Sequence, residues 1–209
     1  QANACRMVAD WNCQREAGIR AQAAARELGS PHLQVRGLIA ESRGRVAVQD
    51  YNRGTRLLAQ AEAILKQHPQ PELLADVMLA YSSMSYSLGR NERGIEYANR
   101  GLAVLQPGEG VTISARLLRN RARSQAQLGQ VEEATESVRA ATALSRQLQD
   151  PKLEAELYLE GARIARIVGD QATQIENGRR ILDMGRRLSS TQLAGLGHEV
   201  LGLAALDVS

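Results

Sequence analysis

Turn signals recur along this chain at a spacing of 40 residues, and this period limits its possible folds more than any other feature. One series has a large apolar residue that is usually followed by glycine: Val8-Ala9, Val48-Gln49, Leu88-Gly89, Leu128-Gly129 and Val168-Gly169. A second series lies half a period away: Ser30-Pro31, Gln70-Pro71, Gly110-Val111, Asp150-Pro151 and Ser190-Thr191. Two turn signals in every 40 residues predict two helices per repeat.

Each turn signal has the chemistry of a helix boundary. Serine or aspartate before proline is an N-cap followed by the first helical position, where the missing N–H of proline leaves no hydrogen bond unmade. Gly89 and its equivalents end a helix, because the left-handed conformation there is favourable mainly for glycine. We expect first helices at about 31–48, 71–88, 111–128, 151–168 and 191–207, and partner helices at about 10–28, 50–67, 91–106, 131–147 and 171–188. Residues 1–8 have the pattern of the end of a further first helix.

Composition favours the same all-α fold. The chain contains no Phe, and aromatic residues make up 3% of it. A core of Ala, Leu, Val and Ile suits close-packed helices better than a sheet protein rich in aromatic and β-branched residues. Small residues recur where helices must approach: Ser42, Ser82, Ala122, Ala162 and Gly202 in the first helices, and Gly54, Gly94, Ala134, Ala61, Gly101 and Ala141 in the second. Since a helical hairpin cannot bury its apolar face alone, we expect antiparallel hairpins stacked into a curved α-solenoid.

This pattern resembles the tetratricopeptide repeat in its long form of about 40 residues, which occurs in bacterial signalling receptors and transcription regulators. The resemblance rests on the small residues, the Leu-Gly turn and the proline that opens the next repeat, and residues 128–134, LGQVEEA, match the family closely. It implies a right-handed superhelix, with residues 1–209 forming one solenoid of about five repeats. Gln14, Gln174, Ile181 and His198 depart from the pattern, and we expect less regular packing there.

The resemblance also implies a binding groove, because the first helices of such a solenoid line its concave face. The side chains expected in the groove are Arg36, Arg43, Tyr86, Arg116, Arg119, Asn120, Arg123, Arg163 and Arg166. Arg116, Arg119 and Arg123 are three and four residues apart, so they share one face of their helix. The sequence therefore predicts a concentration of positive charge on the first helices.

Guanidinium groups bind carboxylates through paired, charge-assisted hydrogen bonds, so the expected partner is a peptide or protein with acidic or carboxylate groups. Members of the family hold a peptide's C-terminal carboxylate with asparagine and basic residues, and this resemblance points to Asn120, Arg116 and Arg123. The alternative is a solvated arginine face that is partly neutralised by Asp76, Glu156 and neighbouring glutamates.

Motifs for catalysis or cofactor binding are absent from the sequence. It has no nucleophile elbow, phosphate loop, HExxH motif or Cys/His set with metal-ligand spacing. His32, His68 and His198 are too far apart in the repeat scheme to share a metal ion. We therefore expect a protein that is not an enzyme and that needs no cofactor. The net charge of +3 comes from 24 Arg and 2 Lys against 23 acidic residues, which is too little to predict a nucleic-acid partner.

The redox state of Cys5 and Cys13 indicates the cellular compartment of the protein. On one continuous helix they would lie about 12 Å apart, too far for a disulfide, but the turn predicted at Ala9-Asp10 brings them together. We expect a disulfide and hence a periplasmic location, whereas two free thiols would indicate the cytoplasm.

The predicted last helix, 191–207, is apolar around much of its surface, although the ends of solenoids normally carry a polar capping helix. We expect either a further segment of a longer protein to cover it or two copies of the chain to associate through it. No stretch of the sequence is apolar enough to cross a membrane, so membrane contact would come from a flanking segment. The resemblance implies a sensor domain of a bacterial signalling protein, with a diguanylate cyclase or kinase as output. The alternative is a cytoplasmic scaffold or the effector-binding domain of a transcription regulator.

Overall fold

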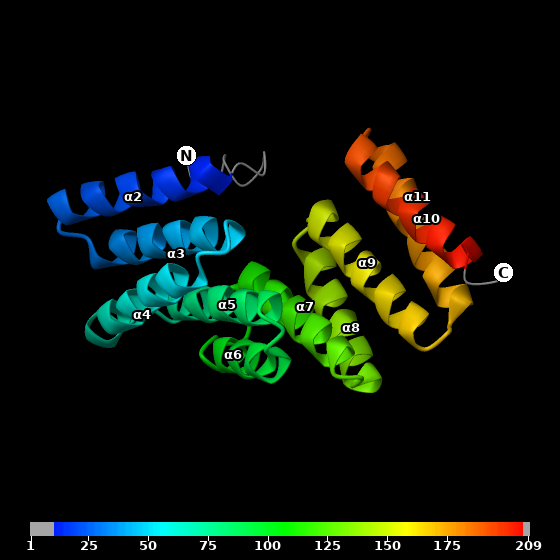
Figure 1. The fold of residues 1–209 in the computed structure, drawn as a ribbon, viewed down its shortest axis with the longest axis horizontal. Coiled ribbons are helices and arrows are strands. Elements are labelled where there is room, and N and C mark those ends of the chain that lie inside the picture. The colour runs from blue at the N-terminus through cyan, green and yellow to red at the C-terminus, as the bar shows by residue number, and fades with distance from the viewer. Residues whose placement is uncertain (1–10, 207–209) are drawn as a thin grey trace. The chain divides into compact units, whose positions relative to one another are not determined.

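The chain folds into α-helices throughout the part that the structure describes. This structure, a computed structural model, describes residues 11–206 apart from the side chains of Trp11, Asn12 and Gln14. Within that range there are ten helices and no strand (Figure 1). The helices are α2 (Trp11–Glu27), α3 (Pro31–Ala47), α4 (Tyr51–Gln67), α5 (Pro71–Ser87), α6 (Asn91–Ala103), α7 (Val111–Gln127), α8 (Val131–Gln147), α9 (Pro151–Ile167), α10 (Gln171–Arg187) and α11 (Thr191–Leu206). The all-α fold predicted from the sequence is confirmed.

The predicted helix boundaries agree with the observed ones almost throughout. Every described helix except α6 begins and ends within about one residue of its predicted limits. Helix α6 ends at Ala103, because Val104 caps it and Pro107, a little further on, disfavours helical geometry at the residue before it. The helix end predicted at residues 1–8 lies outside the described residues.

The helix ends have the capping interactions that the turn signals predict. Asp150 Oδ1 accepts a hydrogen bond from the Leu153 backbone nitrogen at 3.0 Å, and Pro151 occupies the first position of α9. Gly89 follows α5 in the left-handed conformation, with φ of +68°. Gln49 holds the equivalent position after α3 with φ of +63°, although a residue with a Cβ is strained there. The turn geometry therefore follows the repeat even where glycine is replaced.

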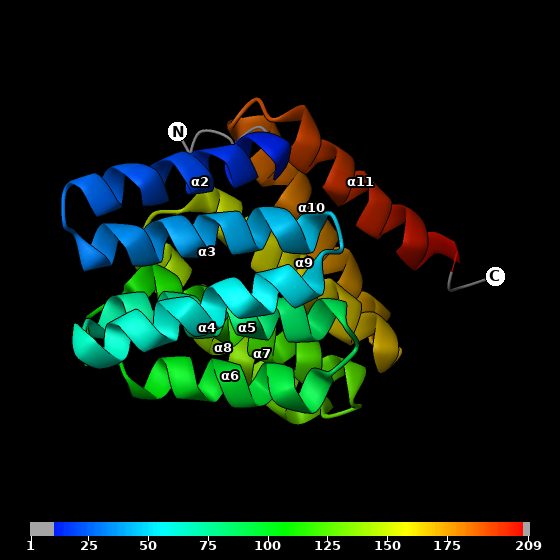
Figure 2. The same ribbon diagram turned by 60° about the vertical axis from the view of Figure 1, so that its left-hand side comes forward.

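Two compact units make up the chain, residues 1–113 and residues 114–209, and the boundary between them falls near the start of α7. In the first unit, α3 packs against α2, α4 and α5, and Figure 2 shows α3 running antiparallel to both α2 and α4. In the second unit, α9 packs against α8, α10 and α11. Helices α3 and α5, like α9 and α11, are successive first helices, so neighbouring first helices lie against each other within each unit.

Small residues stand where the two helices of a hairpin meet. Ser42 Oγ donates a hydrogen bond to the Gly54 carbonyl oxygen at 3.0 Å, and Ser82 Oγ, forty residues later, donates one to Gly94 at 2.9 Å. Gln174, which departs from the pattern, is buried as well, at 3% exposed. The core of the first unit lies between α3, α4 and α5 and includes Val35, Leu38, Ile39, Leu58, Val77, Met78 and Tyr81. The 40-residue period thus repeats contacts as well as turns.

Glycines let two helix pairs approach very closely. A Cβ added to Gly18 of α2 would lie 2.5 Å from the backbone nitrogen of Glu41 in α3. A Cβ added to Gly185 of α10 would lie 2.5 Å from the backbone nitrogen of Ala194 in α11. Any larger residue at these two glycines requires the backbone to move. On the first of these pairs, the close approach brings Gln22 of α2 next to Glu41.

Candidate functional site

Five of the arginines predicted for the groove lie on α7 and α9 of the second unit. Arg116, Arg119 and Arg123 belong to α7, and Arg163 and Arg166 belong to α9. We call these five residues the arginine face. Helical spacing places the α7 arginines on one side of that helix, and the ion pairs between α7 and α9 show that the two helices adjoin.

Two glutamates of α9 hold arginines of this face in place. Glu156 forms an ion pair with Arg119. Glu160, which is only 8% exposed, forms ion pairs with Arg123 and with Arg163 at 3.2 Å each. The carboxylates therefore restrain three of the guanidinium groups and neutralise part of their charge.

Burial and neighbouring arginines both act on the guanidinium group of Arg119. Burial, together with the charges of Arg123, Arg116 and Arg163, lowers the pKa of Arg119 to about 10, and Glu160 opposes this shift. The guanidinium still carries its charge at neutral pH, but its protonated form is disfavoured by its surroundings. An anion bound beside Arg119 would offset that repulsion.

A cavity of about 640 Å³ opens beside the arginine face. Arg163 and Arg166 line it together with three glutamines, namely Gln127, Gln171 and Gln174. The Gln171 amide already donates a hydrogen bond to the Ala204 carbonyl oxygen at 2.8 Å. The sequence analysis identified the two arginines but not the glutamines as site residues. The cavity is formed by side chains of α7, α9 and α10 together, and of the three glutamines only Gln174 was noted, as a departure from the repeat.

Asn120 and Tyr86 have less open positions than the groove prediction implies. Asn120 of α7 is 3% exposed, so its amide is not part of the open surface. Tyr86 of α5, in the first unit, is half-buried. Tyr81 on the same helix lies in the core and stacks on Tyr97, with ring centroids 4.8 Å apart. Burial raises the pKa of Tyr81, and the neighbouring Glu62 raises it further.

The remaining predicted arginines, Arg36 and Arg43, line a separate cavity in the first unit. This cavity has a volume of about 740 Å³ and lies among α2, α3 and α5. Arg20 lines it too, and Arg43 Nη2 forms an ion pair with Asp76 Oδ1 at 2.6 Å. Glu72 adds a second carboxylate to the lining. Positive charge is therefore more fully compensated here than on the arginine face.

The predicted cysteine pair falls only partly within the described residues, and the histidines form no metal site there. Cys5 lies outside the described residues, so the predicted pairing with Cys13 of α2 stays a prediction. His32 Nε2 lies 3.3 Å from the carbonyl oxygen of His68. Among the described residues, no three His, Cys, Asp or Glu side chains are grouped as a metal site would require. Over the same residues, none of the helices combines the length and the apolar character needed to span a membrane.

Comparison with known proteins supports the fold. No family model and no curated protein matches the chain. Among solved structures, the crystal structure of BtubC (BKLC) from P. vanneervenii superposes with a TM-score of 0.77, and the match covers 94% of this chain and 85% of that one. The two sequences are 17% identical, a level at which the likeness shows the fold alone. The chain therefore has an all-α fold of the helical-repeat class.

Proposed function

We propose that this chain is a non-enzymatic protein-interaction domain of the tetratricopeptide class, and that its second unit binds an acidic peptide. The observation that carries the proposal is the cavity beside the arginine face, lined by Arg163, Arg166 and three glutamines. Arginines bind carboxylates with paired hydrogen bonds, and glutamine amides both donate to and accept from a peptide backbone. A peptide with acidic side chains or a free C-terminal carboxylate satisfies both kinds of group.

The ion pairs with Glu156 and Glu160 support the proposal. Because these carboxylates restrain Arg119, Arg123 and Arg163, less side-chain freedom is lost when a ligand binds. The charges of Arg116, Arg123 and Arg163 around Arg119 support it as well, because like charges gathered on one face attract anions.

Binding of a fluorescein-labelled peptide rich in glutamate, followed by fluorescence anisotropy, tests the proposal. We expect Arg163→Gln and Arg166→Gln each to weaken binding by about tenfold, since each removes charge-assisted hydrogen bonds. Arg179→Gln is the matched control: Arg179 is an exposed arginine of α10 outside the cavity lining, and its substitution leaves affinity unchanged. Equal affinity for a peptide with glutamine in place of every glutamate would contradict the proposal.

Arg119 and Arg123 are poorer targets for this test. Their guanidinium groups pair with Glu156 and Glu160, so substituting them leaves partly buried carboxylates without a counter-charge. A loss of peptide binding in such variants would not separate a ligand contact from damage to the fold. Arg163 is half exposed, so its substitution disturbs packing less.

The place of this binding domain in a larger system is the second part of the proposal. We propose that it is the sensor region of a bacterial signalling protein, located in the periplasm if Cys5 and Cys13 form a disulfide. What supports this is the resemblance of the 40-residue repeat to the repeats of bacterial signalling receptors. A cytoplasmic scaffold is the alternative, and reduced thiols in the folded protein would favour it.

A further inference from the structure

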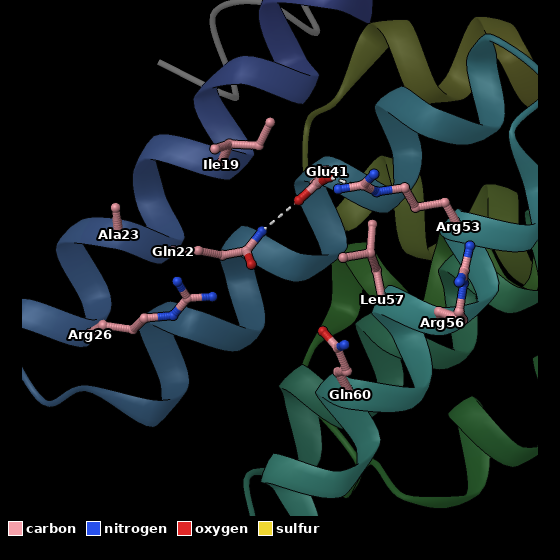
Figure 3. Close-up of a pocket in the computed structure, with 9 residues that line it drawn as sticks. All are labelled: Ile19, Gln22, Ala23, Arg26, Glu41, Arg53, Arg56, Leu57 and Gln60. Atoms are coloured by element: carbon pink, nitrogen blue, oxygen red, sulfur yellow. Dashed lines mark hydrogen bonds and ion pairs between the residues drawn. The ribbon is translucent and has the colours of Figure 1, made fainter.

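A second cavity in the first unit lies between α2 and α4, with Glu41 of α3 in its lining. Its volume is about 490 Å³, within the range of small-molecule sites. Arg26 of α2 and Gln60 of α4 extend toward the space between the two helices, and Arg53 and Arg56 of α4 also line it (Figure 3). Ile19 and Leu57 supply apolar surface. The cavity thus combines three guanidinium groups with an apolar wall.

The one carboxylate in this cavity is already neutralised. Glu41 of α3 is 4% exposed and accepts a hydrogen bond from Gln22 Nε2 at 2.9 Å. Its other oxygen lies 3.3 Å from Arg45 Nη2 and 3.7 Å from Arg53 Nε. Because an ionised carboxylate can only accept, this contact fixes the Gln22 amide, with its oxygen turned away from Glu41 (Figure 3). Within residues 11–206, Arg26 and Arg56 form no ion pair that would neutralise them.

The 40-residue period provides an internal comparison for this cavity. Three periods later, a cavity of about 470 Å³ lies among α8, α9 and α10. For each residue that lines the first-unit cavity, the residue 120 positions later lines this second cavity. Arg56 is the exception, because Glu176 is not part of the second lining. The two cavities are therefore equivalent sites of the repeat, and their differences lie in the side chains.

In the second-unit cavity, internal carboxylates neutralise the arginines. Arg146, the equivalent of Arg26, donates to Glu154 Oε1 at 3.3 Å and to the Tyr158 hydroxyl at 3.0 Å. Arg180 forms an ion pair with Glu176, and its guanidinium lies 5.3 Å from the ring centroid of Tyr158. The arginines of this cavity thus have their anionic partners within the chain.

The first-unit cavity lacks both of those carboxylates. Gln34 stands at the position of Glu154, and Arg56 stands at the position of Glu176. Arg26 is the equivalent of Arg146 and has no acidic residue at the position of Glu154, and Gln60 stands at the position of Arg180. A guanidinium group that faces a cavity without a counter-charge attracts an anion from solution.

We infer that the cavity between α2 and α4 binds a small aliphatic carboxylic acid. The carboxylate pairs with Arg26, as Glu154 pairs with the equivalent Arg146 in the second unit, and the alkyl chain lies against Ile19 and Leu57. The Gln22 amide oxygen offers an acceptor to any hydroxyl or amide group that the ligand carries. This site belongs to the first unit alone and does not depend on the peptide site proposed for the second.

Hexanoate, titrated into the full chain and followed by two-dimensional 15N NMR, is the first probe. We expect shifts in the side-chain amide signals of Gln22 and Gln60, and about tenfold weaker binding in Arg26→Gln. Gln34→Glu restores the internal carboxylate and leaves all the arginines in place, so it should weaken hexanoate binding and raise the melting temperature together. This variant separates loss of the ligand from loss of the fold.

The matched controls are hexanamide, which has the same chain without the charge, and Arg93→Gln. Arg93 is an exposed arginine of α6 in the same unit, outside the cavity lining. Hexanamide binding as tightly as hexanoate, or an Arg93→Gln effect as large as that of Arg26→Gln, would overturn the inference. Tighter binding of hexyl phosphate than of hexanoate would overturn the assignment of the head group to a carboxylate.

Discussion

Replacing Glu160 by glutamine tests how the arginine face is held together. Glu160 is 8% exposed and is the shared partner of Arg123 and Arg163, each at 3.2 Å. It is also the acidic residue that opposes the lowered pKa of Arg119. Glutamine keeps the shape of the side chain and removes the charge, so Glu160→Gln leaves Arg123 and Arg163 without the carboxylate that they share.

The expected loss of stability follows from how far these groups are buried. Removing one member of a fully buried ion pair costs about 3–5 kcal/mol. The side chains of Arg123 and Arg163 are 28% and 52% exposed, so water screens part of the resulting repulsion. We therefore expect Glu160→Gln to lower the free energy of unfolding by about 1–2 kcal/mol.

Urea unfolding of the full chain, followed by far-UV circular dichroism, measures this loss. The loss should shrink when the salt concentration is raised to roughly 1 M, because salt screens the repulsion between arginines. Glu136→Gln is the matched control: it also removes one ion pair of the second unit, but Glu136 and Arg139 are 65% and 72% exposed. If Glu160→Gln destabilised the chain no more than Glu136→Gln does, Glu160 would not be the residue that balances the arginine face.

Two further predictions concern the helix ends. Gln49→Gly should raise the free energy of unfolding by about 1 kcal/mol, because Gln49 has φ of +63° where Gly89 has +68°; an unchanged or lower urea midpoint would contradict this. Asp170 caps α10 by accepting a hydrogen bond from the Thr173 nitrogen at 3.0 Å. Hydrogen bonds from the Thr173 hydroxyl and from this nitrogen lower the pKa of its carboxyl group below 3.8. The stabilisation of the fold by the Asp170 carboxylate is therefore present above pH 3.8 and is lost as the pH falls through the lowered pKa. In urea unfolding, the difference in stability between wild type and Asp170→Ala should be clear at neutral pH and should vanish in strong acid.

The positions of the helices could be predicted from the sequence because each boundary has its own local chemistry. Asp150 and Pro151 fix the start of α9 through one hydrogen bond and one fixed dihedral angle, which depend on nearby residues alone. The end of α6 was placed about three residues too late, since the apolar pattern continues past Ala103 while Val104 already caps the helix. Local signals thus set most of the fold, and the error falls where a pattern and a cap disagree.

The arginine face could be predicted only in part. Helical spacing places Arg116, Arg119 and Arg123 on one side of α7, and that much needs only the sequence. Which acids approach them depends on how deep α9 lies against α7, so the role of Glu160 as a shared partner follows from the structure alone. The glutamine-lined cavity likewise depends on how the side chains of three helices, α7, α9 and α10, meet in space.

The signal for the carboxylic acid site, in contrast, was present in the sequence. A repeat fold places residues one or more periods apart in equivalent surroundings, so the chain is its own reference for each position. Positions 34 and 154 then differ by one negative charge, and positions 56 and 176 differ in the sign of their charge. The sequence analysis did not predict this site because it considered the first helices, which line the groove in the tetratricopeptide family. It did not compare the side chains of the second helices from repeat to repeat. In one copy of this repeated cavity, carboxylates of the chain neutralise the arginines. In the other copy those carboxylates are missing, and an external anion binds most favourably there.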